Sequence, residues 1–200
     1  NTNININFFF CWANHNWYRS WQGSKEILVE QKYGNISDWE THFNYLLLFF
    51  KDSRYQKYNN KPLLMIFKAN FNEKNEMIEY FNKKCIENGF DGICIIDTFE
   101  GYDNNKIQKY TESNKKTDFI HLREPSSSLS CFSSKVVYLP EKIINKTKME
   151  LANRNHHFVR KYNGNKLFKL MSDNIFKNEH VIRGLFFEWD NTPRHSYRGY

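Results

Sequence analysis

The chain has 200 residues, of which 40% are hydrophobic and 18% aromatic, and its formal net charge is +7. This composition excludes a disordered or fibrous chain, and the length suits a single domain over residues 1–200. Apolar runs such as Leu46 to Phe50 are too short to cross a bilayer, and the lysines are scattered rather than gathered into a basic block, so neither a transmembrane segment nor a nucleic-acid partner is expected.

The first quarter of the chain predicts a strand, a short extended piece and a helix. Ile4 to Trp12 is apolar enough for a buried strand, and Glu26 to Glu30 reads as a second extended segment. The segment Ser37-Asp38-Trp39-Glu40 has the pattern of a helix start, and the helix is expected to run to about Phe50. Its predicted apolar face consists of Trp39, Phe43, Leu46, Leu47 and Phe50.

The next segments repeat this alternation of strand and helix. Pro62 introduces a continuous apolar strand from Leu63 to Phe67, and a second strand covers Gly92 to Asp97. Between them, Lys74 to Asn88 predicts a helix that ends at Gly89 in a left-handed cap. Its predicted apolar face consists of Met77, Ile78, Phe81 and Cys85. Continuously apolar strands separated by amphipathic helices indicate an α/β protein with a parallel sheet covered on both faces.

The second half is less regular. Lys116 to Leu122, Val136 to Leu139 and Val181 to Trp189 are candidate strands, and Lys142 to Asn153 has helical composition. The serine-rich stretch Ser126 to Ser134 has no periodicity and is expected to be a loop.

Polar residues follow several predicted strands, at the edge of a parallel sheet where active sites gather. These clusters are Trp12 to Trp21, Lys68 to Asn70, Asp97 to Glu100 and Asp190 to Arg194. Glycosyl chemistry needs one or two carboxylates beside the anomeric carbon, and Asp97, Glu100 and Asp190 are the acids available. Each of these acids could instead be an ordinary helix cap or turn residue.

The first of these clusters has the composition of a sugar-binding loop. Flat indole rings cover the apolar face of a pyranose, while amide and guanidinium groups bond its hydroxyls. The candidate saccharide-binding residues are Trp12, Asn14, His15, Asn16, Trp17, Arg19 and Trp21, with Asn191 and Arg194 from the last cluster. The competing interpretation is that the tryptophans are core residues and the asparagines cap turns.

The remaining motifs predict no metal and no cofactor. The histidines His156, His157 and His180 lack the spacing of a helical zinc site. The four cysteines show no C-x-x-C spacing, which indicates reduced, buried thiols in a cytoplasmic protein.

Five segments together resemble the WbsX-type family of polysaccharide-biosynthesis proteins, also described as glycoside hydrolase family 99-like. In chain order they read WANHNWYRSW, ILVEQKYG, FKDSRYQKYNNKPLLMIFK, ENGFDGICII and FFEWDNTPRHSYRG. The resemblance implies a TIM-type (β/α)₈ barrel and a role in bacterial O-antigen or capsular polysaccharide synthesis. The family is labelled glycosyltransferase, although its relatives in family 99 are endo-acting mannoside hydrolases.

The departures from the family pattern bear on catalysis. Family members have further βα units upstream and continue past the W-D-N-T-P-R segment, so we expect a partial barrel, truncated at both ends. A chain that begins at Asn1 rather than Met fits this expectation. His15 stands where the family commonly has Glu, and Gln22 where it commonly has Asp, so two carboxylates are missing from the first loop.

The sequence therefore predicts a carbohydrate-active protein that acts on a glycosidic bond, with glycosyl transfer favoured. Its partner would be a saccharide or activated sugar; protein partners are not predicted. In this mechanism the tryptophans stack, Asn14, Asn16 and Arg19 bond hydroxyls or a donor phosphate, and Asp190 with Arg194 holds charge near the reacting centre. The alternative is a non-catalytic carbohydrate-binding protein or a degenerate remnant of an endo-mannosidase-like hydrolase.

Overall fold

The computed structural model describes residues 5–19, 26–134, 139–155, 161–174, 176 and 178–187. The chain separates into two compact units. The first contains Asn1–His15, Gln31–Thr98 and Lys109–His121, and the second contains Asn16–Glu30, Phe99–Gln108 and Leu122–Tyr200. Each unit is described by itself below.

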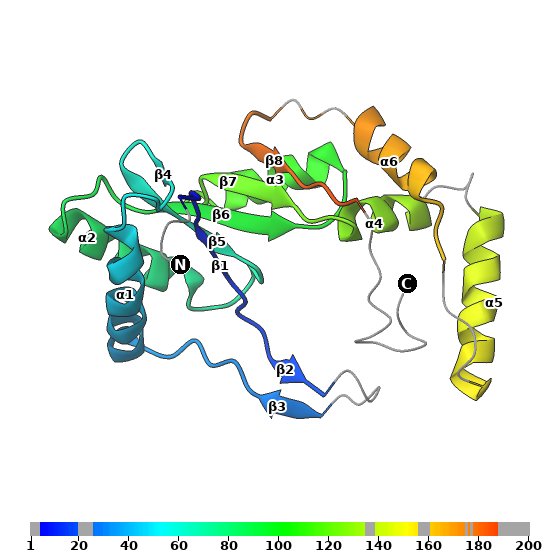
Figure 1. The fold of residues 1–200 in the computed structure, drawn as a ribbon, viewed down its shortest axis with the longest axis horizontal. Coiled ribbons are helices and arrows are strands. Elements are labelled where there is room, and N and C mark those ends of the chain that lie inside the picture. Colours follow the sequence, from blue (N-terminus) through cyan, green and yellow to red (C-terminus); the bar gives the residue numbers. More distant parts are fainter. Residues whose placement is uncertain are drawn as a thin grey trace. The chain divides into compact units, whose positions relative to one another are not determined.

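The main sheet has six strands in the order β1-β5-β6-β7-β8, with β4 paired to β5 (Figure 1). The strands are β1 (Phe10–Trp12), β4 (Lys57–Tyr58), β5 (Lys61–Ile66), β6 (Cys94–Phe99), β7 (Phe119–Leu122) and β8 (Val181–Arg183). β5 runs parallel to both β1 and β6, and only the short β4 is antiparallel to it. The α/β class and the parallel sheet are therefore confirmed. The described strands form an open order and no closed barrel.

The two central strands differ in how they are buried. β6 is buried at each of its first four positions, Cys94 to Asp97, as expected for a strand covered on both faces. In β5 the buried positions alternate, with Pro62, Leu64 and Ile66 inside and their neighbours partly exposed. Coverage on both faces is thus complete for β6 and incomplete for β5.

The core of the first unit lies between the sheet and two helices, α1 (Ile36–Phe50) and α2 (Lys74–Glu87), which pack against each other. The predicted apolar faces are confirmed. The buried residues include Trp39, Phe43, Leu46 and Phe50 from α1, and Met77, Ile78, Phe81 and Cys85 from α2. Leu47, predicted on the same face, is only partly buried. Gly89 has a φ of +86°, so the predicted left-handed cap after α2 is also confirmed.

Helix α1 begins earlier than its sequence pattern indicates. Asn35, rather than Ser37, is the N-cap: its Oδ1 accepts a hydrogen bond from Ser37 N–H at 3.0 Å, and Asp38 Oδ2 accepts from Asn35 N–H at 2.9 Å. This reciprocal pair satisfies two of the N–H groups that a helix start leaves open. The capping box was therefore present in the sequence, two residues before the predicted one.

The second unit contains a two-stranded antiparallel hairpin and three helices. The hairpin joins β2 (Trp17–Tyr18) to β3 (Ile27–Val29), and the helices are α4 (Ser126–Ser134), α5 (Leu139–Asn155) and α6 (Gly164–Asp173). A further helix, α3 (Asn104–Ser113), has its first half in this unit and its second half in the other. Helix α5 confirms the helical composition of Lys142 to Asn153, whereas β2, α3 and α6 were not predicted.

Three predictions for the second half need correction. The stretch Ser126 to Ser134 is a helix, because Leu129 and Phe132 pack against Leu167 and Leu170 of α6, and this contact compensates for the weak helix preference of serine. The strand predicted from Val181 to Trp189 stops at Arg183, where Gly184 N–H donates to the Leu122 carbonyl at 3.1 Å; its last two residues lie outside the described part. Of the strand Val136 to Leu139, Leu139 begins α5 and the rest is not described.

The cysteines are only partly as predicted. All four are free thiols, and Cys85 and Cys94 are buried, which raises the pKa of each to about 12. Cys11 is exposed and Cys131 is half-buried, so burial of all four thiols is wrong. Cys11 lies in the edge strand β1, which has a single neighbour in the described sheet.

Candidate functional site

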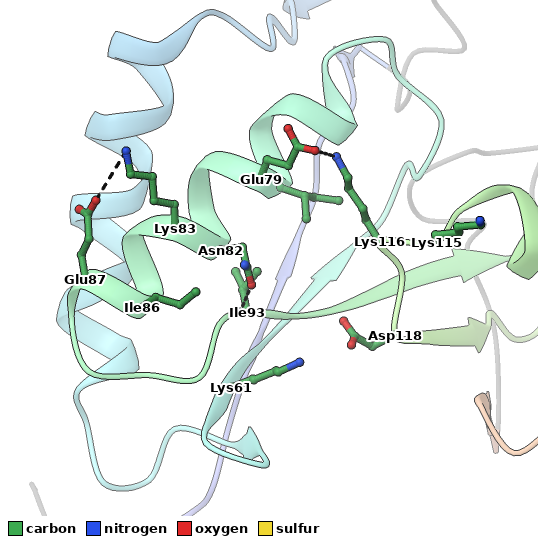
Figure 2. Close-up of a pocket in the computed structure, with 11 residues that line it drawn as sticks. Lys61, Glu79, Asn82, Lys83, Ile86, Glu87, Ile93, Lys115, Lys116 and Asp118 are labelled. Carbon is green, nitrogen blue, oxygen red and sulfur yellow. Dashed lines mark hydrogen bonds and ion pairs between the residues drawn. The ribbon is translucent and has the colours of Figure 1, made fainter.

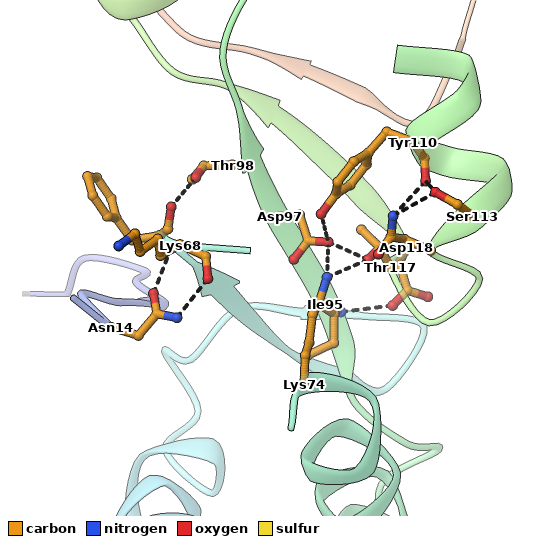
Figure 3. Close-up of polar contacts among 12 residues, drawn as sticks. Asn14, Lys68, Lys74, Ile95, Asp97, Thr98, Tyr110, Ser113, Thr117 and Asp118 are labelled. Atoms are coloured by element: carbon orange, nitrogen blue, oxygen red, sulfur yellow. Dashed lines mark hydrogen bonds and ion pairs between the residues drawn. The ribbon is translucent and has the colours of Figure 1, made fainter. Parts of the chain in front are cut away.

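In the first unit, hydrogen bonds at the carboxyl edge of the sheet join the loop after β1 to the loop after β5, and join the loop after β5 to the end of strand β6 (Figure 3). The side chain of Asn14 joins the two loops. Its Nδ2 donates to the Lys68 carbonyl at 2.8 Å, and its Oδ1 accepts from Lys68 N–H at 2.6 Å. From β6, Thr98 Oγ1 donates to the Phe67 carbonyl. The structure therefore brings together residues from the first three polar clusters singled out in the sequence.

Asn14 is fully buried, and both ends of its amide are bound to backbone. A buried polar side chain with this pairing fixes the relative position of two loops, because losing either bond would leave a buried group unsatisfied. Its predicted role as a direct sugar ligand stays a prediction. The observed contacts favour a role in positioning the loop.

Trp12 belongs to an aromatic cluster beside the core. The half-buried indole meets Tyr33, His42 and Phe71 edge-on, with ring centroids 6.0, 5.0 and 5.9 Å away. Tyr33 stacks on Phe71 at 4.1 Å and donates its hydroxyl to the Asn14 carbonyl at 3.1 Å. Burial lowers the pKa of His42, so this ring is a neutral member of the cluster at physiological pH. These rings cover part of the Trp12 indole, so only the rest of its surface can contact a ligand.

His15 lies beside Phe67, with 5.2 Å between the ring centroids, and is half-buried. The imidazole therefore packs on the loop after β5, close to the interlocked residues Asn14 and Lys68. This position is at the edge of the sheet where the sequence predicted substrate contacts.

Asp97 occupies the centre of a buried polar network in the first unit (Figure 3). Its Oδ2 is in contact with Lys74 Nζ and accepts hydrogen bonds from Thr117 Oγ1 at 2.5 Å and Tyr110 OH at 2.9 Å. Asp97 is 0% exposed and Lys74 is 4% exposed. Burial and the neighbouring Asp97 carboxylate raise the pKa of Tyr110, which keeps the phenol protonated as a donor. A carboxylate this enclosed ties β6 to α2 and to the turn before β7.

The hairpin of the second unit carries three of the predicted sugar ligands. Trp17 is 59% exposed, and Asn16 Nδ2 lies 3.5 Å from the hydroxyl of the neighbouring Tyr18. Arg19 pairs across the hairpin with Glu26, with 3.3 Å between Nε and Oε2. The indole of Trp17 is therefore available to a ligand, whereas the guanidinium of Arg19 already has a carboxylate partner.

A cavity of about 370 Å³ opens in the second unit where β6 ends. Its lining includes the carboxylates of Glu100 and Asp103, the phenol of Tyr102 and the ammonium of Lys106. The turn at Gly101 has a φ of +107°, which L side chains rarely adopt, and its N–H donates to Ser127 Oγ at 3.1 Å. Glu100 and Tyr102, on either side of this turn, both line the cavity.

The acids around this cavity occupy different environments. Glu100 forms an ion pair with Arg123, the first residue after β7. Glu124 accepts a hydrogen bond from the Tyr102 hydroxyl and another from Ser128 N–H at 3.1 Å. Burial raises the pKa of Glu124, although the hydrogen bonds from Ser128 oppose this shift. The Glu100 carboxylate is thus paired with a cation, whereas Glu124 is half-buried and bound to the Tyr102 phenol. Two carboxylates in such different environments are suited to acid–base chemistry.

Four predicted site residues, Trp21, Asp190, Asn191 and Arg194, lie outside the described residues. Five other polar residues that line or support the cavity were not chosen from the sequence: Tyr102, Asp103, Lys106, Arg123 and Glu124. The signal for Arg123 and Glu124 was present, because they directly follow the strand predicted to end at Leu122. The carboxyl-edge argument applied to that strand would have selected both.

Within the part of the chain that the structure describes, no three His, Cys, Asp or Glu side chains are grouped so that they could hold a metal ion. No helix among the same residues has the length and apolar character needed to span a membrane.

Comparison with known proteins identifies the family. Residues 1–200 match the model of a family described as glycosyltransferase WbsX. Neither curated proteins nor solved structures include a match to the chain. Since the family model covers every residue, the chain belongs to the WbsX glycosyltransferase family.

Proposed function

We propose that this protein transfers a glycosyl group from an activated sugar to a saccharide acceptor during assembly of bacterial surface polysaccharide, O-antigen or capsule, in the cytoplasm. The observation that carries the proposal is the cavity after β6, because it gathers a carboxylate, a phenol and an ammonium group in about 370 Å³. We place this site in a single domain over residues 1–200, whose open sheet is part of a (β/α)₈ barrel.

In this proposal Glu100 is the catalytic base. The acceptor hydroxyl attacks the anomeric carbon of the donor, the bond from that carbon to the leaving group breaks, and the hydroxyl proton passes to the Glu100 carboxylate. The departing group of an activated sugar is a phosphate, which needs a cation as its charge develops. Lys106 lines the same cavity and is the side chain suited to that role.

Tyr102 and Glu124 orient the acceptor. Because the Tyr102 hydroxyl donates a hydrogen bond to Glu124, the lone pairs of the phenol oxygen are left to accept from a substrate hydroxyl. Glu124 acts through Tyr102 and is a positioning residue.

The other predicted residues keep more general roles. Trp12, Trp17 and Trp21 supply aromatic surface for sugar rings, and Asn16, Arg19, Asn191 and Arg194 supply polar contacts. Asp190 is a further candidate acid. Asp97 is reassigned from catalysis to positioning, because its carboxylate is enclosed by Lys74, Tyr110 and Thr117.

The test is a transfer assay with nucleoside-diphosphate sugars and oligosaccharide acceptors, in which both the glycosylated product and the released nucleoside diphosphate are measured. Glu100→Gln should lower kcat by roughly 100-fold or more if general-base catalysis is lost. Lys106→Gln should weaken use of the donor. Glu40→Gln, an exposed acid on α1, is the matched control and should keep wild-type turnover.

Saccharide binding without catalysis is the second candidate, and the exposed indole of Trp17 beside Tyr18 favours it. Under that function, calorimetry detects oligosaccharide binding that Trp17→Ala weakens by about 1–2 kcal/mol, while no donor gives product. Turnover that survives Glu100→Gln unchanged would remove Glu100 from the mechanism.

A further inference from the structure

A second cavity, of about 510 Å³, lies in the first unit at the edge of the sheet where the parallel strands begin (Figure 2). It is formed by Lys61 at the start of β5, Ile93 just before β6, residues 115–118 before β7, and one side of α2. This edge is opposite to the one that carries Lys68 and Thr98. The volume falls in the range of about 300–1,000 Å³ that is typical of small-molecule sites.

The wall contributed by α2 is partly apolar. Ile78, Asn82 and Ile86 follow one another at helical spacing, and Ile93 faces them from the sheet. Ile78 and Ile93 are each 4% exposed, whereas Ile86 is 57% exposed and forms the rim. A ligand that enters can therefore cover the exposed surface of Ile86, while Ile78 and Ile93 add little water-exposed surface, and this favours a ligand with an apolar body.

A polar group is fixed within this apolar wall. Asn82 Oδ1 accepts a hydrogen bond from Ile93 N–H at 3.1 Å, which orients the amide so that its NH₂ group remains as a donor. Gly92, with a φ of +113°, allows this approach, since a methyl group there would lie 2.4 Å from Asn82 Oδ1. The backbone conformation before β6 is thus adapted to hold this side chain in place.

The residues that line the cavity carry more positive than negative charge. Lys116 pairs with Glu79, and Lys83 Nζ lies 3.9 Å from Glu87 Oε1 (Figure 2). Two other lysines of the cavity, at positions 61 and 115, make no ion pair with any residue that the structure describes.

The acid that remains is Asp118, whose carboxylate accepts Ile95 N–H at 2.8 Å. When the two ion pairs are counted as neutral, Lys61, Lys115 and Asp118 give the lining a net charge of +1. The net charge of +7 for the whole chain adds a potential of the same sign.

We propose that this cavity is a binding site for a small amphipathic monoanion. Its apolar body, aromatic or branched aliphatic, packs on Ile78, Ile86 and Ile93, and its carboxylate or sulfonate is held by Lys61 and Lys115. This site is additional to the proposed glycosyl-transfer cavity and does not depend on that function.

The probe is 8-anilinonaphthalene-1-sulfonate, a fluorescent monoanion with an aromatic body, titrated into the whole chain. Its uncharged analogue, N-phenyl-1-naphthylamine, tests whether the head group is recognised. Variants are Lys61→Gln, Lys115→Gln and Ile86→Glu; Lys51→Gln, at the exposed end of α1, removes the same charge elsewhere and is the matched control. Far-UV circular dichroism and thermal melting verify that each variant folds.

We expect each of Lys61→Gln and Lys115→Gln to raise the Kd for the sulfonate about three- to ten-fold, as for loss of a charged contact. Ile86→Glu should raise it by about ten-fold or more, because it places a like charge against the anion. Lys51→Gln should change it by less than about two-fold. Binding that is absent, or that responds to the cavity variants no more than to Lys51→Gln, overturns the site. If the lysine variants raise the Kd of the uncharged analogue as much as that of the sulfonate, the lysines do not recognise the head group, and that part of the proposal is overturned.

Discussion

The buried pair of Lys74 and Asp97 allows a quantitative test of how the first unit is held together. Lys74→Met keeps most of the length of the side chain and removes its ammonium group. Asp97 would then remain 0% exposed, with only the hydroxyls of Thr117 and Tyr110 as donors. Breaking a buried ion pair from one side costs about 3–5 kcal/mol, because the charge left behind lacks both water and partner. We therefore expect Lys74→Met to lower the free energy of unfolding by about that amount.

The measurement is urea unfolding followed by circular dichroism, with equal m-values required for comparison. Lys83→Met is the matched control: the residue is on the same helix, its side chain is 76% exposed, and it lies 3.9 Å from Glu87. An exposed pair of this kind contributes about 0–1 kcal/mol. The double variant Lys74→Met, Asp97→Leu removes both charges and should recover much of the loss, since apolar replacement of a buried pair is often neutral.

Two results would refute this reasoning. One is a Lys74→Met variant that loses no more stability than Lys83→Met, because the site would then be accessible to water. The other is a double variant that is as unstable as the sum of its single changes, because the cost would then come from packing rather than from an uncompensated charge.

Three further predictions concern the loops, the acids and the thiols. Asn14→Ala should lower the free energy of unfolding by about 2–4 kcal/mol in urea titrations, because it removes both side-chain hydrogen bonds between the β1 and β5 loops; a loss below about 0.5 kcal/mol would contradict this. Because burial raises the pKa of Glu124 above its ordinary value of 4.5, the folded protein binds a proton here more tightly than the unfolded chain does. The contribution of Glu124 protonation to the free energy of unfolding is therefore full at low pH and is lost as the pH rises through the raised pKa. Since Gln does not titrate, Glu124→Gln should flatten the fall in Tm above pH 4.5. In native protein, a thiol reagent followed by mass spectrometry should modify exposed Cys11 and spare Cys85 and Cys94, whose thiols have a pKa of about 12.

Local sequence patterns determined the two long helices and the two central strands of the first unit, α1, α2, β5 and β6. The apolar faces of α1 and α2, the left-handed Gly89 and the apolar run of β6 each depend on neighbours a few residues away. Such regularities are visible without knowledge of the fold, because helix and strand periods are properties of the backbone. The same logic placed the sugar-site candidates after strands, at an edge where Asn14 and Thr98 indeed lie.

Tertiary structure decided which groups those residues contact. Asn14 and Asp97 are residue types that bind ligands, but Lys68, 54 residues away, binds both ends of the Asn14 amide, and Lys74, 23 residues away, binds Asp97 Oδ2. The serine-rich α4 packs on α6 through Leu129 and Phe132, and its sequence has no helical period that predicts this helix. Neither outcome can be read from local pattern, because the contacts of a polar side chain depend on which residues, distant in sequence, lie beside it in the folded protein. The sequence determined where polar groups leave the strands; the folded packing determined which of them remain available to a substrate.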